Sequence, residues 1–267
     1  MIALSVNLNK IALIRNSRDT TNPSIPEHAE LALAAGADGI TVHPRPDQRH
    51  IRASDCEDLA AILPAERGVE LNIEGNPFAG PRDSDRAGVS DYPGFMELVK
   101  ALRPAQCTLV PDGDAQLTSD HGFDLTREGD RVAPVIEALQ ALGIRVSLFL
   151  DPDPDQVRLA AQTGTDRIEL YTESYAAAHS SGKDVDRVFN RFRDAAECAA
   201  DLGLGLNAGH DLDLNNLPRF ATIPGLLEVS IGHALTVDCL RLGMEATIKA
   251  YQLALGKKRV GRTRRFA

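Results

Sequence analysis

Short runs of branched apolar residues recur along the chain, and longer stretches with helical periodicity lie between them. Strands are predicted near residues 2–7, 39–43, 69–74, 106–110, 144–150, 167–171, 203–207 and 227–231. Local signals mark the helices: Pro26 suits the first turn of a helix that ends before Gly36, and Ser54 with Glu57 fits a capping box. This alternation predicts a parallel sheet in an α/β protein.

Eight strand–helix units average about 33 residues each, which is the size of a βα repeat. Eight units favour closure into a (β/α)8 TIM barrel. No G-x-G-x-x-G motif opens a helix, which counts against an open, dinucleotide-binding sheet. We expect one barrel domain over residues 1–255 and a flexible basic tail over 256–267. Residues 75–95, rich in Gly, Pro, Asp and Ser, are predicted to form a long loop, either surface decoration or a lid.

Side chains alternate between the two faces of a strand, so each predicted strand divides into two sets. The apolar set is expected to face the helices: Leu4, Val6, Ile40, Val42, Leu71, Ile73, Ile168, Leu170, Leu204, Leu206, Val229 and Ile231. The opposite set points into the barrel: Asn7, His43, Asn72, Glu74, Glu169, Asn207, Ser230 and Gly232. An unpaired polar group buried there costs several kcal/mol. Polar inward positions near the carboxyl ends of strands therefore predict the mouth of an active site.

The composition and net charge of the chain limit the kinds of partner and cellular setting that we expect. Lys and Arg total 29 against 38 Asp and Glu, a formal net charge of -9, which argues against general nucleic-acid binding. The four cysteines form no C-x-x-C pair, which indicates a reducing, cytoplasmic setting. No apolar run approaches the roughly 20 residues that span a bilayer, and the amino terminus lacks a signal peptide's features. The basic run 257–265 is predicted to be a disordered tail, or a subunit or polyanion contact.

Three ionisable side chains end or closely follow the second, third and seventh predicted strands: His43, Glu74 and His210. Gathered at one mouth, they would supply two bases and an acid with tunable pKa values. The same set of two histidines and a carboxylate could instead hold a metal ion. No H-x-H or H-x-x-x-H spacing supports a metal, and we expect none.

Two segments at the last two strands predict anion binding. Small residues in 207–210 (Asn-Ala-Gly-His) and 230–233 (Ser-Ile-Gly-His) let backbone N–H groups approach a phosphate, and barrels often bind phosphate there. A second anion could be held by Arg18, Arg45, Arg49 and His50.

These motifs resemble those of the pyridoxine 5'-phosphate synthase family, and the resemblance extends over nearly the whole chain. The matching segments are Val6-Asn7, Arg15-Asn16-Ser17-Arg18, residues 35–43, Arg49-His50-Ile51, residues 71–74, Leu109-Val110-Pro111, residues 146–149, Ile168-Glu169-Leu170, residues 207–210 and residues 231–234. Together they are far more specific than a shared barrel.

The resemblance implies a (β/α)8 barrel that condenses 3-amino-2-oxopropyl phosphate with 1-deoxy-D-xylulose 5-phosphate. The products would be pyridoxine 5'-phosphate, inorganic phosphate and water, formed without a metal or organic cofactor. The family assembles as an octamer, so a homo-oligomer is implied.

The resemblance also assigns roles to single residues of this chain. It implies that His43 and Glu74 accept protons, that His210 donates one, and that Glu169 stabilises the transition state. The aminoketone phosphate would lie on Asn7, Arg18, Gly232 and His233, and the deoxyxylulose phosphate on Arg45, His50 and Thr118.

Two departures from the family pattern bear on substrate binding. Where the family reads Asn-x-Asp-His, this chain has Asn7-Leu8-Asn9-Lys10. Asn9 therefore lacks the negative charge of the family's Asp, and Lys10 carries a permanent positive charge in place of the family's His. After His210 the family has Gly, whereas Asp211 stands here beside a predicted phosphate site. A carboxylate there repels phosphate unless it is turned away or paired, for example with Lys10.

Two other functions stay open from the sequence. One is a barrel aldolase or epimerase acting on another phosphorylated ketose, in which Lys10 would form a Schiff base. The other is a phosphosugar-binding barrel without turnover, against which the joint presence of His43, Glu74 and His210 argues.

Overall fold

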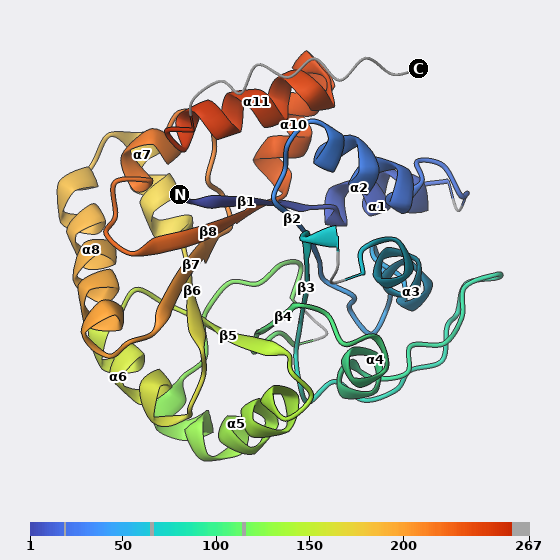
Figure 1. Cartoon of the computed structure of the whole chain (residues 1–267), viewed down its shortest axis with the longest axis horizontal. Helices are drawn as coiled ribbons and strands as arrows, with labels where there is room; N and C mark the ends of the chain where they lie inside the picture. The colour runs from blue at the N-terminus through green and yellow to red at the C-terminus, as the bar shows by residue number, and fades with distance from the viewer. Residues whose placement is uncertain (19, 65–66, 114–115, 258–267) are drawn as a thin grey trace.

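The computed structural model describes residues 1–18, 20–64, 67–113 and 116–257. Within these ranges eight parallel strands follow one another around a closed barrel, and β1 completes the ring by pairing with β8 (Figure 1). The strands are β1 (Ala3–Asn7), β2 (Gly39–Val42), β3 (Glu70–Gly75), β4 (Gln106–Leu109), β5 (Arg145–Leu150), β6 (Arg167–Tyr171), β7 (Gly205–Gly209) and β8 (Leu226–Ile231). The (β/α)8 barrel expected from the sequence is confirmed.

Helices form the outer layer around the ring (Figure 1). They are α1 (Asn9–Asn16), α2 (Ile25–Ala34), α3 (Ala53–Ile62), α4 (Phe95–Leu102), α5 (Leu125–Gln140), α6 (Pro154–Gln162), α7 (Glu173–Ser181), α8 (Val185–Asp201), α9 (Leu217–Phe220), α10 (His233–Leu242) and α11 (Met244–Ala254). The last helix packs on α10 and on α2, so the two ends of the chain close the layer together. In the described part of the chain, no helix combines the length and apolar character needed to cross a membrane.

Two helix starts test the local signals in the sequence. The Ser24 hydroxyl accepts the N–H of Glu27 at 3.3 Å and Pro26 lies in the first turn of α2, as predicted. The predicted capping box at Ser54 and Glu57 is wrong. Helix α3 begins at Ala53, two residues earlier than a cap at Ser54 implies, and the Asp55 carboxylate accepts the N–H of Arg52 at 2.7 Å.

The predicted division of the strands into two faces is confirmed. Leu4, Ile40 and Val229 are fully buried in the apolar layer between strands and helices. On the other face, the Thr108 hydroxyl of β4 donates to Glu169 of β6 at 3.3 Å. These strands are not neighbours in the ring, so this hydrogen bond passes through the interior. The β7 strand begins two residues later than expected, because α8 runs on to Asp201 and residue 203 turns with a φ of 74°.

Ion pairs occupy the amino-terminal end of the barrel. Arg167 lies 3.4 Å from Glu228, and the Arg145 guanidinium donates to Glu70 at 3.0 Å. Burial raises the pKa of Glu228 to about 7 despite the neighbouring Arg167. These charges are paired, and the active sites of such barrels lie at the other, carboxyl-terminal end of the strands.

The long loop predicted after the third strand is present, because β3 ends at Gly75 and α4 begins at Phe95. It folds back on itself through an antiparallel bridge between Arg82 and Tyr92. Most of the basic tail predicted for 256–267 falls on residues 258–267, which lie outside the described residues.

Candidate active site

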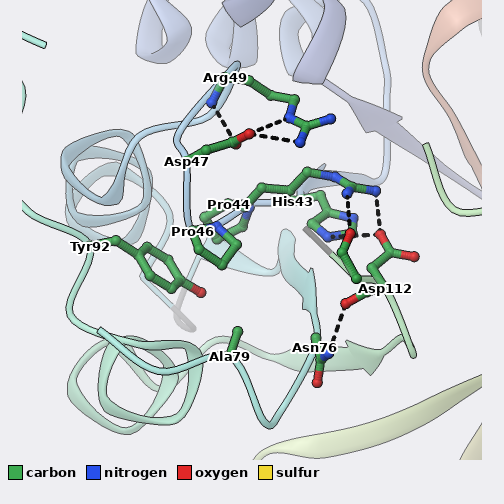
Figure 2. Close-up of a pocket in the computed structure, with 11 residues that line it drawn as sticks. His43, Pro44, Pro46, Asp47, Arg49, Asn76, Ala79, Tyr92 and Asp112 are labelled. Atoms are coloured by element: carbon green, nitrogen blue, oxygen red, sulfur yellow. Dashed lines mark hydrogen bonds and ion pairs between the residues drawn. The ribbon is translucent and has the colours of Figure 1, made fainter. Parts of the chain in front are cut away.

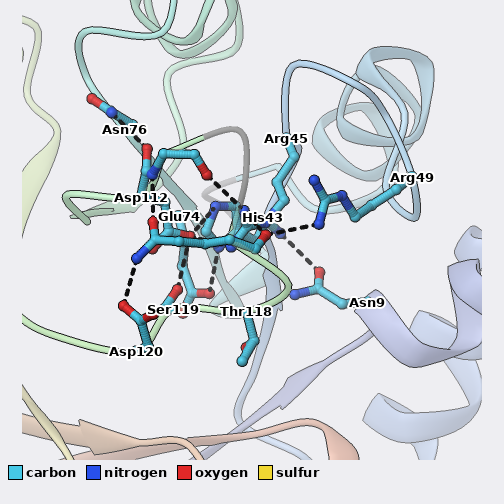
Figure 3. A network of polar contacts seen from close by, with 12 residues as sticks. Asn9, His43, Arg45, Arg49, Glu74, Asn76, Asp112, Thr118, Ser119 and Asp120 are labelled. Carbon is cyan, nitrogen blue, oxygen red and sulfur yellow. Dashed lines mark hydrogen bonds and ion pairs between the residues drawn. The ribbon is translucent and has the colours of Figure 1, made fainter.

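His43 follows directly after β2 and lies between two carboxylates (Figure 3). Its Nδ1 is 3.8 Å from Oε2 of Glu74 on β3, and its Nε2 is 3.5 Å from Oδ2 of Asp112, just after β4. The Asn9 side-chain oxygen accepts the backbone N–H of His43 at 2.9 Å, which ties the start of α1 to the end of β2. The carboxylates of β3 and of the segment after β4 therefore flank the imidazole at the end of β2.

The charge state of His43 follows from its surroundings. Burial is the main cause that lowers the pKa of His43 to about 3, and the charges of Arg45 and Arg49 lower it further. The imidazole is consequently neutral near pH 7 and has a lone pair available for a proton.

Glu74 has the opposite shift. Burial is the main cause that raises the pKa of Glu74 well above its usual value, and the nearby carboxyl groups of Glu169 and Asp112 raise it further. The side-chain amide of Asn7 donates to Oε2 of Glu74 at 3.4 Å. A carboxylate with a raised pKa is a stronger base than an exposed one.

Glu169 on β6 lies deeper in the barrel. Its Oε2 accepts the Thr108 hydroxyl. A Cβ atom at Gly209 would lie 2.5 Å from Oε1 of Glu169 and 2.9 Å from the Ser230 carbonyl oxygen, so a larger residue at 209 would displace the Glu169 side chain or the β8 backbone. Burial and then the charge of Glu228 raise the pKa of Glu169 to about 8. This carboxyl is therefore protonated over much of the neutral range.

His210 follows β7 on the other side of the mouth. Its Nε2 is 2.9 Å from the Thr118 hydroxyl, and its Nδ1 is 2.8 Å from Oδ2 of Asp211. The Tyr171 ring packs edge-on against the imidazole at a centroid distance of 5.2 Å. The closest partner of Asp211 is thus His210, not the Lys10 suggested by the sequence, although the charge of Lys10 also acts on Asp211.

A pocket beside His43 is lined by residues from three loops (Figure 2). Arg45 and Arg49 both donate to the backbone carbonyl of Gln116, at 3.0 and 2.8 Å. Tyr92 contributes from the long loop after β3. The side chain of Gln48 donates to the Ser90 carbonyl at 2.6 Å, so this loop supports the arginine-bearing segment.

The remaining predicted binding residues are spread around the mouth. Nδ1 of His50 accepts the N–H of Ile51 at 2.9 Å, and the His50 ring is 6.3 Å from that of His43. A Cβ atom at Gly232 would lie 3.2 Å from the Asn7 side chain, so these two positions touch. His233 is exposed at the start of α10.

Arg18 stands apart from this group. It is exposed in the segment after α1, and its backbone N–H donates to the Arg15 carbonyl at 3.3 Å. Among the described residues, no other predicted site residue contacts it.

Asp112 is the residue that sequence reasoning missed. The residue is 7% exposed, and its Oδ2 accepts the Ser119 hydroxyl at 2.8 Å and an N–H of Arg45. Burial raises the pKa of Asp112, although Arg45 opposes the shift. The signal was available, because Pro111-Asp112-Gly113 follows β4 directly and the recognised motif stopped at Pro111.

Replacing Asp112 by Asn is expected to lower the free energy of unfolding by about 3 kcal/mol, because it leaves the buried Arg45 guanidinium without its counter-charge. Chemical denaturation measures the loss. Asp83→Asn, an exposed position on another loop, should change stability by about 0.5 kcal/mol or less. Equal stability of Asp112→Asn and the wild type would show that the pair with Arg45 contributes nothing.

Metal binding was the other interpretation of His43, Glu74 and His210. Over the described residues, no group of three or more His, Cys, Asp or Glu side chains is arranged to hold a metal ion.

Comparison with known proteins identifies the family. The family model described as "Pyridoxal phosphate biosynthesis protein PdxJ" matches residues 4–257. The chain belongs to this family. A PdxJ relative named pyridoxine 5'-phosphate synthase from Xanthomonas oryzae pv. oryzae is 54% identical over 261 residues, covering 97% of this chain and 99% of the relative. The synthase of the same name from Xylella fastidiosa is 51% identical over 249 residues, covering 93% and 92%.

Solved structures outside the PdxJ family share the architecture. The 3-hexulose-6-phosphate synthase from Salmonella typhimurium superposes with a TM-score of 0.58 at 13% sequence identity, covering 95% of this chain and 98% of that one. Thiamine phosphate pyrophosphorylase from Pyrococcus furiosus gives a TM-score of 0.56 at 10% identity, covering 96% and 95%. At this identity the likeness concerns the barrel fold alone.

Proposed function

We propose that this chain is a pyridoxine 5'-phosphate synthase. It condenses 3-amino-2-oxopropyl phosphate with 1-deoxy-D-xylulose 5-phosphate to give pyridoxine 5'-phosphate, phosphate and water. The observation that carries the proposal is a mouth lined by His43, Glu74 and His210 in a chain that belongs to the PdxJ family.

The residues at the mouth suit the chemistry of ring closure. Joining an amine to a ketone needs a base to free the amine and an acid to remove water from the carbinolamine. His43, which is neutral, and the carboxylate of Glu74 serve as the two bases. His210 returns a proton to the departing oxygen. Glu169, deeper in the barrel, stabilises the polar transition state. The later losses of water and phosphate use the same acid and bases.

Two phosphate sites supply the binding energy that orients both reactants. Arg45 and His50 hold the deoxyxylulose phosphate, since a guanidinium binds phosphate through paired N–H groups. The aminoketone phosphate lies on Gly232 and His233 at the start of α10, because the first N–H groups of a helix favour an anion. Asn7, Asn9, Lys10, Arg18, Thr118 and Asp211 complete the two sites. We extend the proposal to a homo-oligomer of the kind that the family forms.

A direct assay tests the function. Purified protein is mixed with both substrates, and pyridoxine 5'-phosphate is followed by its fluorescence, with the Xanthomonas oryzae relative as the positive control. Product formation is expected. Absence of product where the control turns over contradicts the proposal. An adduct trapped on Lys10 by borohydride in the presence of a phosphorylated ketose would favour an aldolase instead.

A further inference from the structure

A carboxylate directly follows the histidine at the β7 end of the mouth and turns back onto its ring. Oδ2 of Asp211 lies 2.8 Å from Nδ1 of His210, and the hydrogen bond from His210 is the main cause that lowers the pKa of Asp211. An ionised carboxylate only accepts hydrogen bonds. Nδ1 of His210 therefore carries a hydrogen in both its neutral and its cationic form.

The backbone is built to hold this contact. His210 and Asp211 have successive positive φ angles of 80° and 53°, a region that L-residues rarely adopt. The fully buried Thr172 hydroxyl donates to the carbonyls of Gly209 and His210. The side chain of Asn216 donates to the carbonyl of Asp211 at 3.1 Å. Thr172 and Asn216 thus fix a turn that glycine would occupy with less strain.

The other ring nitrogen is the one that exchanges protons. Nε2 of His210 faces the Thr118 hydroxyl at 2.9 Å, on the loop after β4. With Nδ1–H held by Asp211, neutral His210 presents a lone pair at Nε2, and the imidazolium presents its second proton there. When that proton passes to the departing hydroxyl of the carbinolamine, water leaves and neutral His210 remains.

We propose that Asp211 is a positioning residue that fixes the tautomer of His210, so that Nε2 delivers the proton in the reaction. The inference rests on the proposed function for the identity of the reaction, but not for the geometry. The proposal also explains why a carboxylate is tolerated next to a phosphate site. The Asp211 carboxylate is hydrogen-bonded to His210, and the nearby Lys10 and His233 also favour its ionised form.

Replacing Asp211 by Gly separates this role from a structural one. Because glycine suits a φ of 53°, Asp211→Gly should melt at or above the wild-type temperature, while kcat falls roughly 10- to 100-fold. Asp184→Gly is the matched control: Asp184 has a φ of 55° and is exposed at the start of α8, so this variant should keep its turnover. Asp211→Glu should recover part of the lost turnover.

The second readout does not depend on turnover. Nitrogen-15 chemical shifts of the histidine rings report which nitrogen bears the hydrogen, and His210→Asn identifies the signal of interest. Neutral His210 is expected as the Nδ1–H tautomer in the wild type and as a mixture in Asp211→Gly. The proposal is overturned if Asp211→Gly keeps the tautomer of the wild type, if it keeps kcat, or if its loss of kcat is accompanied by a lower melting temperature. A wild type without product contradicts the proposed function and leaves the tautomer experiment to decide on Asp211.

Discussion

Replacing Glu74 by Gln is expected to lower kcat by roughly 10²- to 10⁴-fold, the range typical for one general acid–base group. Gln has the same size, and its carbonyl oxygen can still accept the amide of Asn7, so the fold should persist. It cannot accept a proton. The expected loss is large because burial raises the pKa of Glu74 and strengthens its carboxylate as a base. Steady-state turnover with both substrates measures the effect.

A matched substitution lies on the same strand. Glu70→Gln removes a carboxylate at the start of β3, where Glu70 pairs with Arg145 at the amino-terminal end of the barrel. We expect this variant to keep kcat and to lose a little stability. If both variants lose turnover equally, or if Glu74→Gln retains it, Glu74 is not a base in the reaction.

Replacing Glu169 by Gln is expected to stabilise the protein at alkaline pH. The pKa of Glu169 is raised from 4.5 to about 8 by burial, so the folded state holds a proton that the unfolded chain releases above pH 4.5. The stability contributed by this group is complete below pH 4.5 and is lost as the pH rises to 8. At 1.36 kcal/mol per pKa unit, the full loss is about 5 kcal/mol. Gln is neutral at every pH and avoids it.

Urea unfolding at pH 5 and pH 9 measures this difference. Wild type should lose stability between the two values, and Glu169→Gln should lose much less. Glu228→Gln is the comparison: its pKa is raised only to about 7 and the substitution breaks the pair with Arg167, so a smaller gain is expected. Parallel pH profiles for wild type and Glu169→Gln would falsify the assignment of a neutral Glu169. Turnover of Glu169→Gln should fall, so stability and activity change in opposite directions.

The barrel was predictable because its determinants are local and repetitive. Each strand carries its own apolar alternation, as Leu4 with Val6 and Ile40 with Val42 do, and one register satisfies all of them. The same parity placed Glu74 and Glu169 on the inner face before any contact was known. Ring closure then brought these side chains close enough for their charges to interact.

Other features depend on contacts between distant segments, which no local pattern encodes. The role of the Asp112 carboxylate in the site depends on its hydrogen bonds with Arg45, 67 residues earlier, and with Ser119. The predicted capping box failed because Asp55 also accepts two N–H groups of Arg15, a residue 40 positions away, and so belongs to a buried pair. In both cases the tertiary partner decides the role of the carboxylate.

Hydrogen bonds that span the lumen have an evolutionary consequence. Thr108 on β4 reaches Glu169 on β6, and Gln106 on β4 accepts the amide of Asn207 on β7 at 3.3 Å. Since water does not readily replace a lost partner there, a substitution on one wall leaves a polar group on the opposite wall without a hydrogen-bond partner. Substitutions inside the ring should therefore arise in covarying pairs. Loops, which escape this coupling, are the easier route by which such a barrel diverges toward new substrates.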